Sequence, residues 1–223
     1  MDGSSKVTPR REFMRNVGLG MAAMAVTGVA ARAKAEPRDD TVPDPDAWVK
    51  RITGKHRQVF DIVTPNDGWG LAFAQTFINQ NMQAYGLKQS DISTVVSIRH
   101  MAIALVLNDA MWSRYKLGQF FKITDHATKA PATRNVFSHT RPGDMEVPGI
   151  GVAELISHGA IVTACNMAFT AMSGITAGAA GLPAATARSE WVANLIPGVV
   201  LVPAGVIAVN RAQENHCTYC YAG

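Results

Sequence analysis

The sequence lacks the short motifs that mark nucleotide-dependent enzymes and the common hydrolases. It contains no G-x-G-x-x-G after a strand, no Walker A sequence, no G-x-S-x-G and no H-E-x-x-H. Each of these motifs places a phosphate, a nucleophile or a metal ion at a particular turn or helix. Without them, dinucleotide binding and nucleotide hydrolysis have no support in the sequence.

An excess of charge is also missing from most of the chain. The formal net charge is +4, but residues 1–35 hold six Lys and Arg residues and only two acidic ones, so the rest carries 15 of each sign. This balance removes any charge-based case for nucleic-acid binding in that part. Internal repeats and low-complexity tracts are absent, and 223 residues are enough to bury an ordinary core without disulfides.

Residues 1–35 resemble a twin-arginine export signal. Arg10 and Arg11 precede an uncharged stretch, residues 16–31, that is rich in Gly and Ala, and an A-x-A cleavage site follows. We expect the twin-arginine machinery to export the folded protein to a periplasmic or other extracytoplasmic location, with a mature chain that begins at Glu36. The apolar stretch is too short to be expected to remain as a membrane span. The alternatives are a cytoplasmic helix with an Arg pair and an uncleaved anchor.

The rest of the chain divides into a linker or surface arm at 36–56 and a domain at 57–223. Proline and charge dominate the arm, in which Trp48 and Ile52 are apolar enough to pack back on the domain. The domain alternates predicted strands at 59–63, 93–98, 160–164, 199–202 and 218–222 with predicted helices at 69–85, 101–114, 152–157, 183–195 and 206–215. This alternation predicts an α/β fold of three layers, with a mostly parallel sheet and helices on both faces.

An insertion at about 115–150 departs from this pattern. It has little periodicity and carries several Pro and Gly residues together with His126, His139, Asp125, Asp144 and Glu146. A connection of this length is usually an active-site cover, an interface arm or a disordered loop. Its His and carboxylate residues show no metal-ligand spacing, so no metal site is predicted there.

A stretch without charged residues, Gly159–Ala187, is long enough to cross a bilayer. Its Gly, Thr, Ser and Pro content and the change from strand to helix pattern inside it favour a buried core element over a membrane span.

Cys165 lies where that strand pattern ends. Ile161, Val162 and Thr163 are β-branched, and the residues after Cys165 favour a helix. The carboxyl ends of parallel strands form the ligand crevice of α/β folds, and a helix N-terminus favours a thiolate. Cys165 is therefore a candidate nucleophile, with His100 at the end of the preceding strand as a candidate neighbour. The alternative is an inert cysteine of the core.

Cys217 and Cys220 form a C-x-x-C pair near the C-terminus. The pair fits a structural disulfide, two free thiols, part of a metal site or a catalytic thiol pair; haem attachment is excluded because Tyr221, not His, follows the second cysteine. The segment reads as a strand, in which residues three apart face opposite sides, so a bridge between them would require a turn.

Several stretches together resemble the DsrE/DsrF-like sulfur-relay family over roughly residues 57–222. They are S-I-R-H at 97–100, G-A-I-V-T-A-C-N-M-A at 159–168, V-P-A-G-V at 202–206, and Ala212-Gln213 with Tyr219. The resemblance implies a flavodoxin-like or related α/β fold and assembly as homotrimers or larger rings. It also implies that the cysteine at position 165 accepts and passes on sulfur as a persulfide.

Two functions of different classes follow. The first is a sulfur carrier or sulfurtransferase outside the cytoplasm, with Cys165 as acceptor, His100 as its neighbour, and a sulfur donor or acceptor protein as partner. The second is a non-catalytic, oligomeric periplasmic protein that binds a small ligand or metal, with Cys165 in the core. For both we expect a homo-oligomer, with a trimer favoured, and no cofactor is predicted.

Overall fold

A sheet of five parallel strands lies at the centre of the computed structural model, which describes residues 44–223 apart from 146 and 148. The strand order is β4-β3-β2-β1-β5. The strands are β1 (His56–Ile62), β2 (Ile92–Ile98), β3 (Ile161–Cys165), β4 (Val200–Val202) and β5 (Thr218–Tyr221). Each strand lies where the sequence predicted one, and the sheet is parallel throughout.

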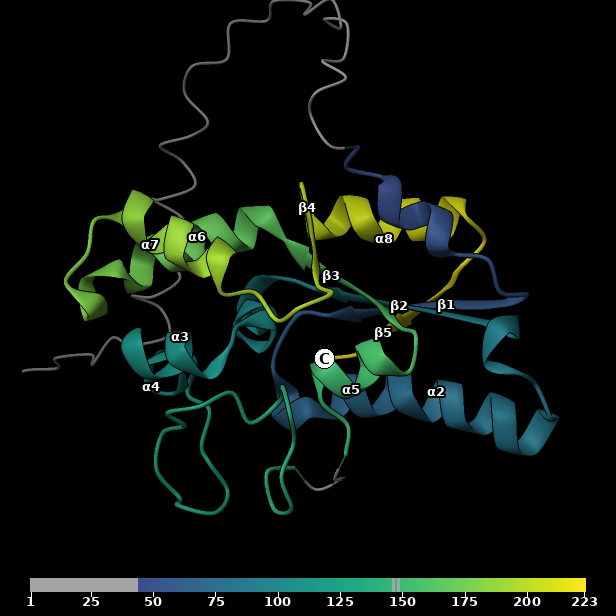
Figure 1. The fold of residues 1–223 in the computed structure, drawn as a ribbon, viewed down its shortest axis with the longest axis horizontal. Coiled ribbons are helices and arrows are strands. Elements are labelled where there is room, and N and C mark those ends of the chain that lie inside the picture. Colours follow the sequence, from purple (N-terminus) through teal and green to yellow (C-terminus); the bar gives the residue numbers. More distant parts are fainter. Residues whose placement is uncertain (1–43, 146, 148) are drawn as a thin grey trace, which may run out of the picture. The chain divides into compact units, whose positions relative to one another are not determined.

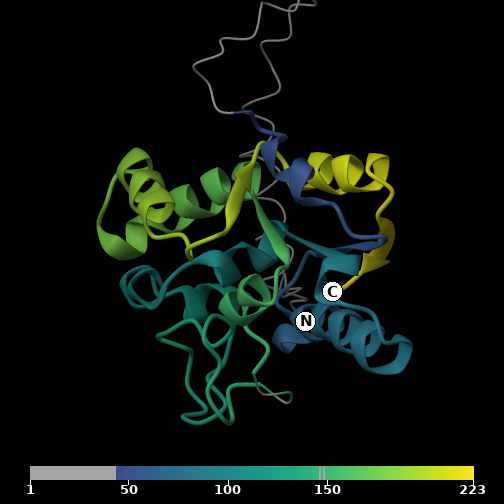
Figure 2. The same ribbon diagram turned by 45° about the vertical axis from the view of Figure 1, so that its right-hand side comes forward.

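Helices cover both faces of the sheet (Figures 1 and 2). One face carries α2 (Trp69–Tyr85) and α5 (Val152–Ser157). The other face carries α8 (Gly205–Glu214) and the short 3-10 helix η1 (Ala47–Arg51). The result is the three-layer α/β arrangement that the sequence predicted, consistent with a flavodoxin-like fold.

The alternation of side chains along the strands divides the apolar core into two layers. Phe60, Val96 and Val162 belong to the layer under α2 and α5, and their neighbours Val59, Val95 and Ile161 belong to the layer under α8. Trp48 and Ile52 are buried in the second layer, as the sequence indicated. The end of the expected arm is thus packed on the sheet.

Two further helices, α6 (Asn166–Thr176) and α7 (Ala184–Ala193), follow β3 and pack against each other (Figure 1). The rings of Phe169 and Trp191 pack edge to face, with 5.3 Å between their centroids. The uncharged stretch 159–187 is therefore divided among a buried strand and several helices. In the described part of the chain, no helix is long and apolar enough to cross a membrane.

The helix predicted at 101–114 is wrong as a single element. The chain forms a 3-10 helix, η4 (His100–Val106), and then a separate helix α3 (Asp109–Arg114), whose first turn is capped by Asn108. The residues of η4 after Met101 are fully buried, so the segment has no solvent-facing side that an amphipathic α-helix would need. Ile103, Leu107 and Met111 are buried in the core.

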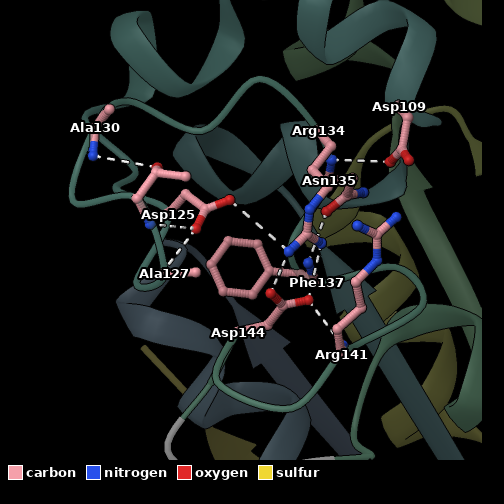
Figure 3. Close-up of polar contacts among 10 residues, drawn as sticks. Asp109, Asp125, Ala127, Ala130, Arg134, Asn135, Phe137, Arg141 and Asp144 are labelled. Carbon is pink, nitrogen blue, oxygen red and sulfur yellow. Dashed lines mark hydrogen bonds and ion pairs between the residues drawn. The ribbon is translucent and has the colours of Figure 1, made fainter.

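The insertion is bound to η4 and to the first residue of α3 by hydrogen bonds from Asn135, and Figure 3 shows Asn135 beside Asp109. After the short helix α4 (Leu117–Phe121), it is held mainly by Asn135. The Asn135 side-chain amide donates hydrogen bonds to the carbonyls of Leu105 and Leu107 at 2.8 and 2.7 Å, and its backbone N–H donates to Asp109 at 2.9 Å. Because these bonds satisfy buried polar groups at the end of η4, the insertion is an integral part of the packed domain and not a free loop.

A buried ion pair joins two parts of the insertion, at residues 134 and 144. The Arg134 guanidinium donates two hydrogen bonds to the Asp144 carboxylate and lies 3.8 Å from Asp125 (Figure 3). Burial opposes ionisation of Asp144, but hydrogen bonds from the Arg134 side chain and the Arg141 backbone hold its pKa below the ordinary value. A carboxyl group with a lowered pKa stabilises the fold above its unfolded pKa of about 4, and this contribution is lost as the pH falls through the folded pKa.

Loss of this pair should loosen the insertion selectively. We expect Asp144→Asn at pH 7 to speed amide hydrogen exchange roughly 10- to 150-fold across residues 123–145, because a charged hydrogen bond contributes about 1.5–3 kcal/mol. Acidification of the wild type through the lowered pKa of Asp144 should likewise reduce amide protection factors across these residues. Asp67→Asn, at an exposed position, is the matched control and should change nothing there. Unchanged exchange in Asp144→Asn would show that the pair does not hold the segment.

Candidate functional site

Cys165 ends β3 and caps α6. Its sulfur accepts a hydrogen bond from the backbone N–H of Ala168 at 3.4 Å, and only 7% of the residue is exposed. The strand ends here because the β-branched run gives way to residues that favour a helix. The predicted placement of Cys165 at a strand-to-helix junction is confirmed, and its sulfur lies against the positive end of the α6 dipole.

A row of polar residues crosses the sheet beside Cys165. Asp61 of β1 pairs in register with Ser97 of β2, and Ser97 pairs with Thr163 of β3. All three are buried. Since Thr163 and Cys165 are two residues apart in one strand, their side chains lie on the same face. The sheet therefore presents polar groups at its carboxyl edge on the side that α8 covers.

Arg99 is the charged group next to Cys165. It follows β2 and donates hydrogen bonds to both carboxylate oxygens of Asp61, at 2.7 and 2.8 Å, while the hydroxyl of Tyr219 donates to the same carboxylate at 3.0 Å. The hydrogen bond with Asp61 raises the pKa of Arg99, burial opposes this, and the charges of Asp61, Tyr219 and Cys165 add to the rise. Asp61 thus fixes a guanidinium within electrostatic reach of the Cys165 sulfur.

Gly205 allows α8 to begin against these two residues. A side-chain carbon at position 205 would lie 2.7 Å from Cβ of Arg99 and 3.2 Å from Cβ of Cys165, closer than packed atoms tolerate. The Gly205 carbonyl also accepts a long hydrogen bond from Ser97, at 3.4 Å. The glycine in V-P-A-G-V therefore has a steric role: it lets the first turn of α8 close over the polar row.

His100 does not occupy the place expected for it. It is exposed, with φ of 52°, and the hydrogen bonds and ion pairs found among residues 44–223 do not connect it with Cys165. Arg99, one residue earlier, is the charged residue near Cys165, since the Cβ atoms of both lie against Gly205. The sequence did contain a signal for this network, because Asp61 is the one charged residue in the buried half of β1, residues 59–62, where a carboxylate requires a partner.

The C-terminal cysteines lie on opposite faces of the sheet. Cys217 is buried in the layer under α8, and Cys220 pairs with Phe60 in register and packs on the other layer. Both are free thiols. Burial raises the pKa of Cys217 to about 11, despite the nearby charge of Arg57, and burial also raises the pKa of Cys220. In this arrangement the two sulfurs lie on opposite faces of the sheet and are not joined by a disulfide.

No cluster of three or more His, Cys, Asp or Glu residues suited to a metal ion is found in the described ranges 44–145 and 149–223, nor with residue 147. The two C-terminal thiols cannot share one ion in this arrangement, because the sheet separates them.

Comparisons with known proteins add little to this site. No protein-family model matches the chain, and no curated protein matches it. Among solved structures, the chain is similar to the protein of unknown function MTH1491 from Methanobacterium thermoautotrophicum, with 19% identity and a TM-score of 0.41. The match covers 74% of this chain and 98% of that chain. A likeness at this level carries no information on function.

Proposed function

We propose that this protein is an exported sulfur carrier in which Cys165 accepts sulfur as a persulfide and passes it on. The observation that carries the proposal is the placement of Cys165 at the carboxyl edge of the sheet, with the Ala168 N–H on its sulfur and the Arg99 guanidinium in reach. Both groups favour negative charge on sulfur. The test is sulfur loading of the isolated protein, read by mass spectrometry.

The reaction needs no oxidant if the donor is itself a persulfide. The Cys165 thiolate attacks the outer sulfur of R–S–SH, a bond forms between the two sulfurs, and R–S⁻ leaves with the electron pair of the broken S–S bond. Transfer to an acceptor thiolate reverses these roles. Arg99 stabilises the anionic persulfide between the two steps, and Asp61 keeps Arg99 from swinging into solvent.

One observation favours the competing function, a non-catalytic oligomeric binding protein. Cys165 is only 7% exposed, as an inert core cysteine would be. Iodoacetamide distinguishes the two functions, because an accessible thiolate is alkylated near neutral pH and a packed thiol is not. Cys217 provides an internal reference for a packed thiol, with its pKa of about 11.

Export should depend on the arginine pair, which lies outside the described residues. Because the twin-arginine machinery reads both guanidinium groups, we expect Arg10→Lys with Arg11→Lys to leave precursor in the cytoplasm, while the wild-type mature chain begins at Glu36. Arg15→Lys is the matched control, since it makes the same change outside the pair. Fractionation and N-terminal sequencing measure the result, and normal export of the double variant would refute the signal.

We also propose a homo-oligomer, with a trimer favoured by the family resemblance. The exposed side of α6 supports it, because Met167 and Ile175 are 55% and 50% exposed and the helix has no charged residue. Light scattering at micromolar concentration should therefore give a multiple of the monomer mass, and Ile175→Glu should lower it. Thr186→Glu, at an exposed site on α7, is the control. A wild-type protein that stays monomeric contradicts the proposal.

A further inference from the structure

Arg188 of α7 reaches back to the start of α6. Its guanidinium donates one hydrogen bond to the side-chain oxygen of Asn166 at 2.7 Å and another to the hydroxyl of Thr170 at 3.0 Å. Asn166 directly follows Cys165 and is the first residue of α6. Helix α7 thus places the positive charge of Arg188 beside Asn166, in the turn that follows Cys165.

This charge is not neutralised within the described part of the chain. Both acceptors of Arg188 are neutral, and no ion pair there includes it. The acidic residue of the same helix, Glu190, is bonded to Arg114 and Tyr115 instead. A guanidinium has five N–H donors, and these two hydrogen bonds leave three for another acceptor.

The position is unfavourable for a cation. A helix N-terminus carries partial positive charge, and a neighbouring cation there is destabilising unless an anion joins it. Arg99 is the other arginine close to Cys165, but its charge is compensated by Asp61. The uncompensated charge next to this turn therefore comes from Arg188, which directly follows a stretch, 159–187, without any acidic residue.

We infer that Arg188 selects a sulfur donor or acceptor that bears a negatively charged group, such as a carboxylate, close to its reactive sulfur. This inference rests on the proposed function of Cys165 and names the substrate class of that site. A carboxylate matches the fork of N–H donors that Arg188 has left, whereas a neutral thiol compound gains nothing from it.

Charged and neutral alkylating reagents test the selection without any sulfur donor. Iodoacetate and iodoacetamide both react when the Cys165 thiolate displaces iodide, and they differ in the charge that Arg188 would attract. We expect the ratio of the iodoacetate rate to the iodoacetamide rate at Cys165 to fall roughly 3- to 10-fold in Arg188→Gln, the effect of one charge several ångströms away. Arg188→Lys keeps the charge and should keep most of the ratio.

The matched control is Arg51→Gln, which removes the same charge near the amino end of the sheet, where Arg51 lies close to Gly159 and Ile161. Its ratio should equal that of the wild type. High salt offers a measurement without any variant, since 1 M NaCl should lower the wild-type ratio toward that of Arg188→Gln.

The outcomes separate this inference from the proposed function. Cys165 that reacts with both reagents at a ratio insensitive to Arg188→Gln and to salt overturns the anion selection and leaves the carrier proposal standing. Cys165 that reacts with neither reagent in the folded protein overturns both.

Discussion

One sulfur atom per chain should be gained on incubation with a small persulfide donor, and peptide mass spectrometry should find it on Cys165. Cys165→Ser should take up none at that position, because the hydroxyl is not a nucleophile at neutral pH. The expected effect is complete loss of sulfur uptake at position 165 rather than slower uptake. Serine is close to cysteine in size and can accept the Ala168 N–H in its place, so the fold should survive the substitution.

The control is the variant with Cys217→Ser and Cys220→Ser, which should still load. Cys217 is buried with a pKa of about 11, so at pH 7.5 almost none of it is thiolate. If instead the C-terminal thiols take up sulfur and Cys165 stays inert, the carrier role belongs to the C-terminal pair. Cys165 is then a core residue, and the binding-protein function gains support.

Arg99→Met should destabilise the domain by about 2–3 kcal/mol and slow sulfur uptake. It leaves the buried carboxylate of Asp61 with Tyr219 as its remaining side-chain partner, and removal of one member of a buried ion pair costs about 3–5 kcal/mol. We take a lower value because 26% of the Arg99 side chain is exposed. The midpoint of thermal unfolding should fall by roughly 4–12 °C for a domain of this size.

A second substitution separates the loss of the attraction between Arg99 and Asp61 from the cost of leaving the Asp61 carboxylate buried without Arg99. Arg99→Met with Asp61→Leu removes both ions, so unfolding measurements should show part of the stability restored relative to Arg99→Met alone. Sulfur uptake should stay slow in the double variant, because the guanidinium near Cys165 is still missing. Arg51→Met controls for loss of an exposed arginine and should change the midpoint little. An equal, small change in Arg51→Met and Arg99→Met would contradict the buried pair.

Local patterns in the sequence determined most of the elements. The helix α2 ends at Gly86 because a glycine at φ of 66° closes the helix without a steric penalty. β3 stops at Cys165 because β-branched residues give way to helix formers at that point. The opposite placement of Cys217 and Cys220 also followed from the sequence, since the period of a strand is a local property.

Tertiary packing decided the segment at 101–114. Its apolar residues fit an α-helical pattern, but residues 102–107 are all buried, so this part has no exposed side. Under those conditions the pattern no longer marks one face of a helix, and the choice between α and 3-10 geometry depends on the neighbours that surround it.

The partners of Cys165 were also decided by the tertiary structure. Tyr219 meets Asp61 across 158 residues of sequence because β5 returns to lie beside β1. Arg99 is bound to Asp61 close to Cys165, whereas His100, the first residue of η4, is exposed with φ of 52°. The sequence of two adjacent residues does not reveal this difference in backbone conformation. The sequence by itself determined where the thiol lies along its strand. The charges around it depend on strand order and helix packing, which bring distant residues together.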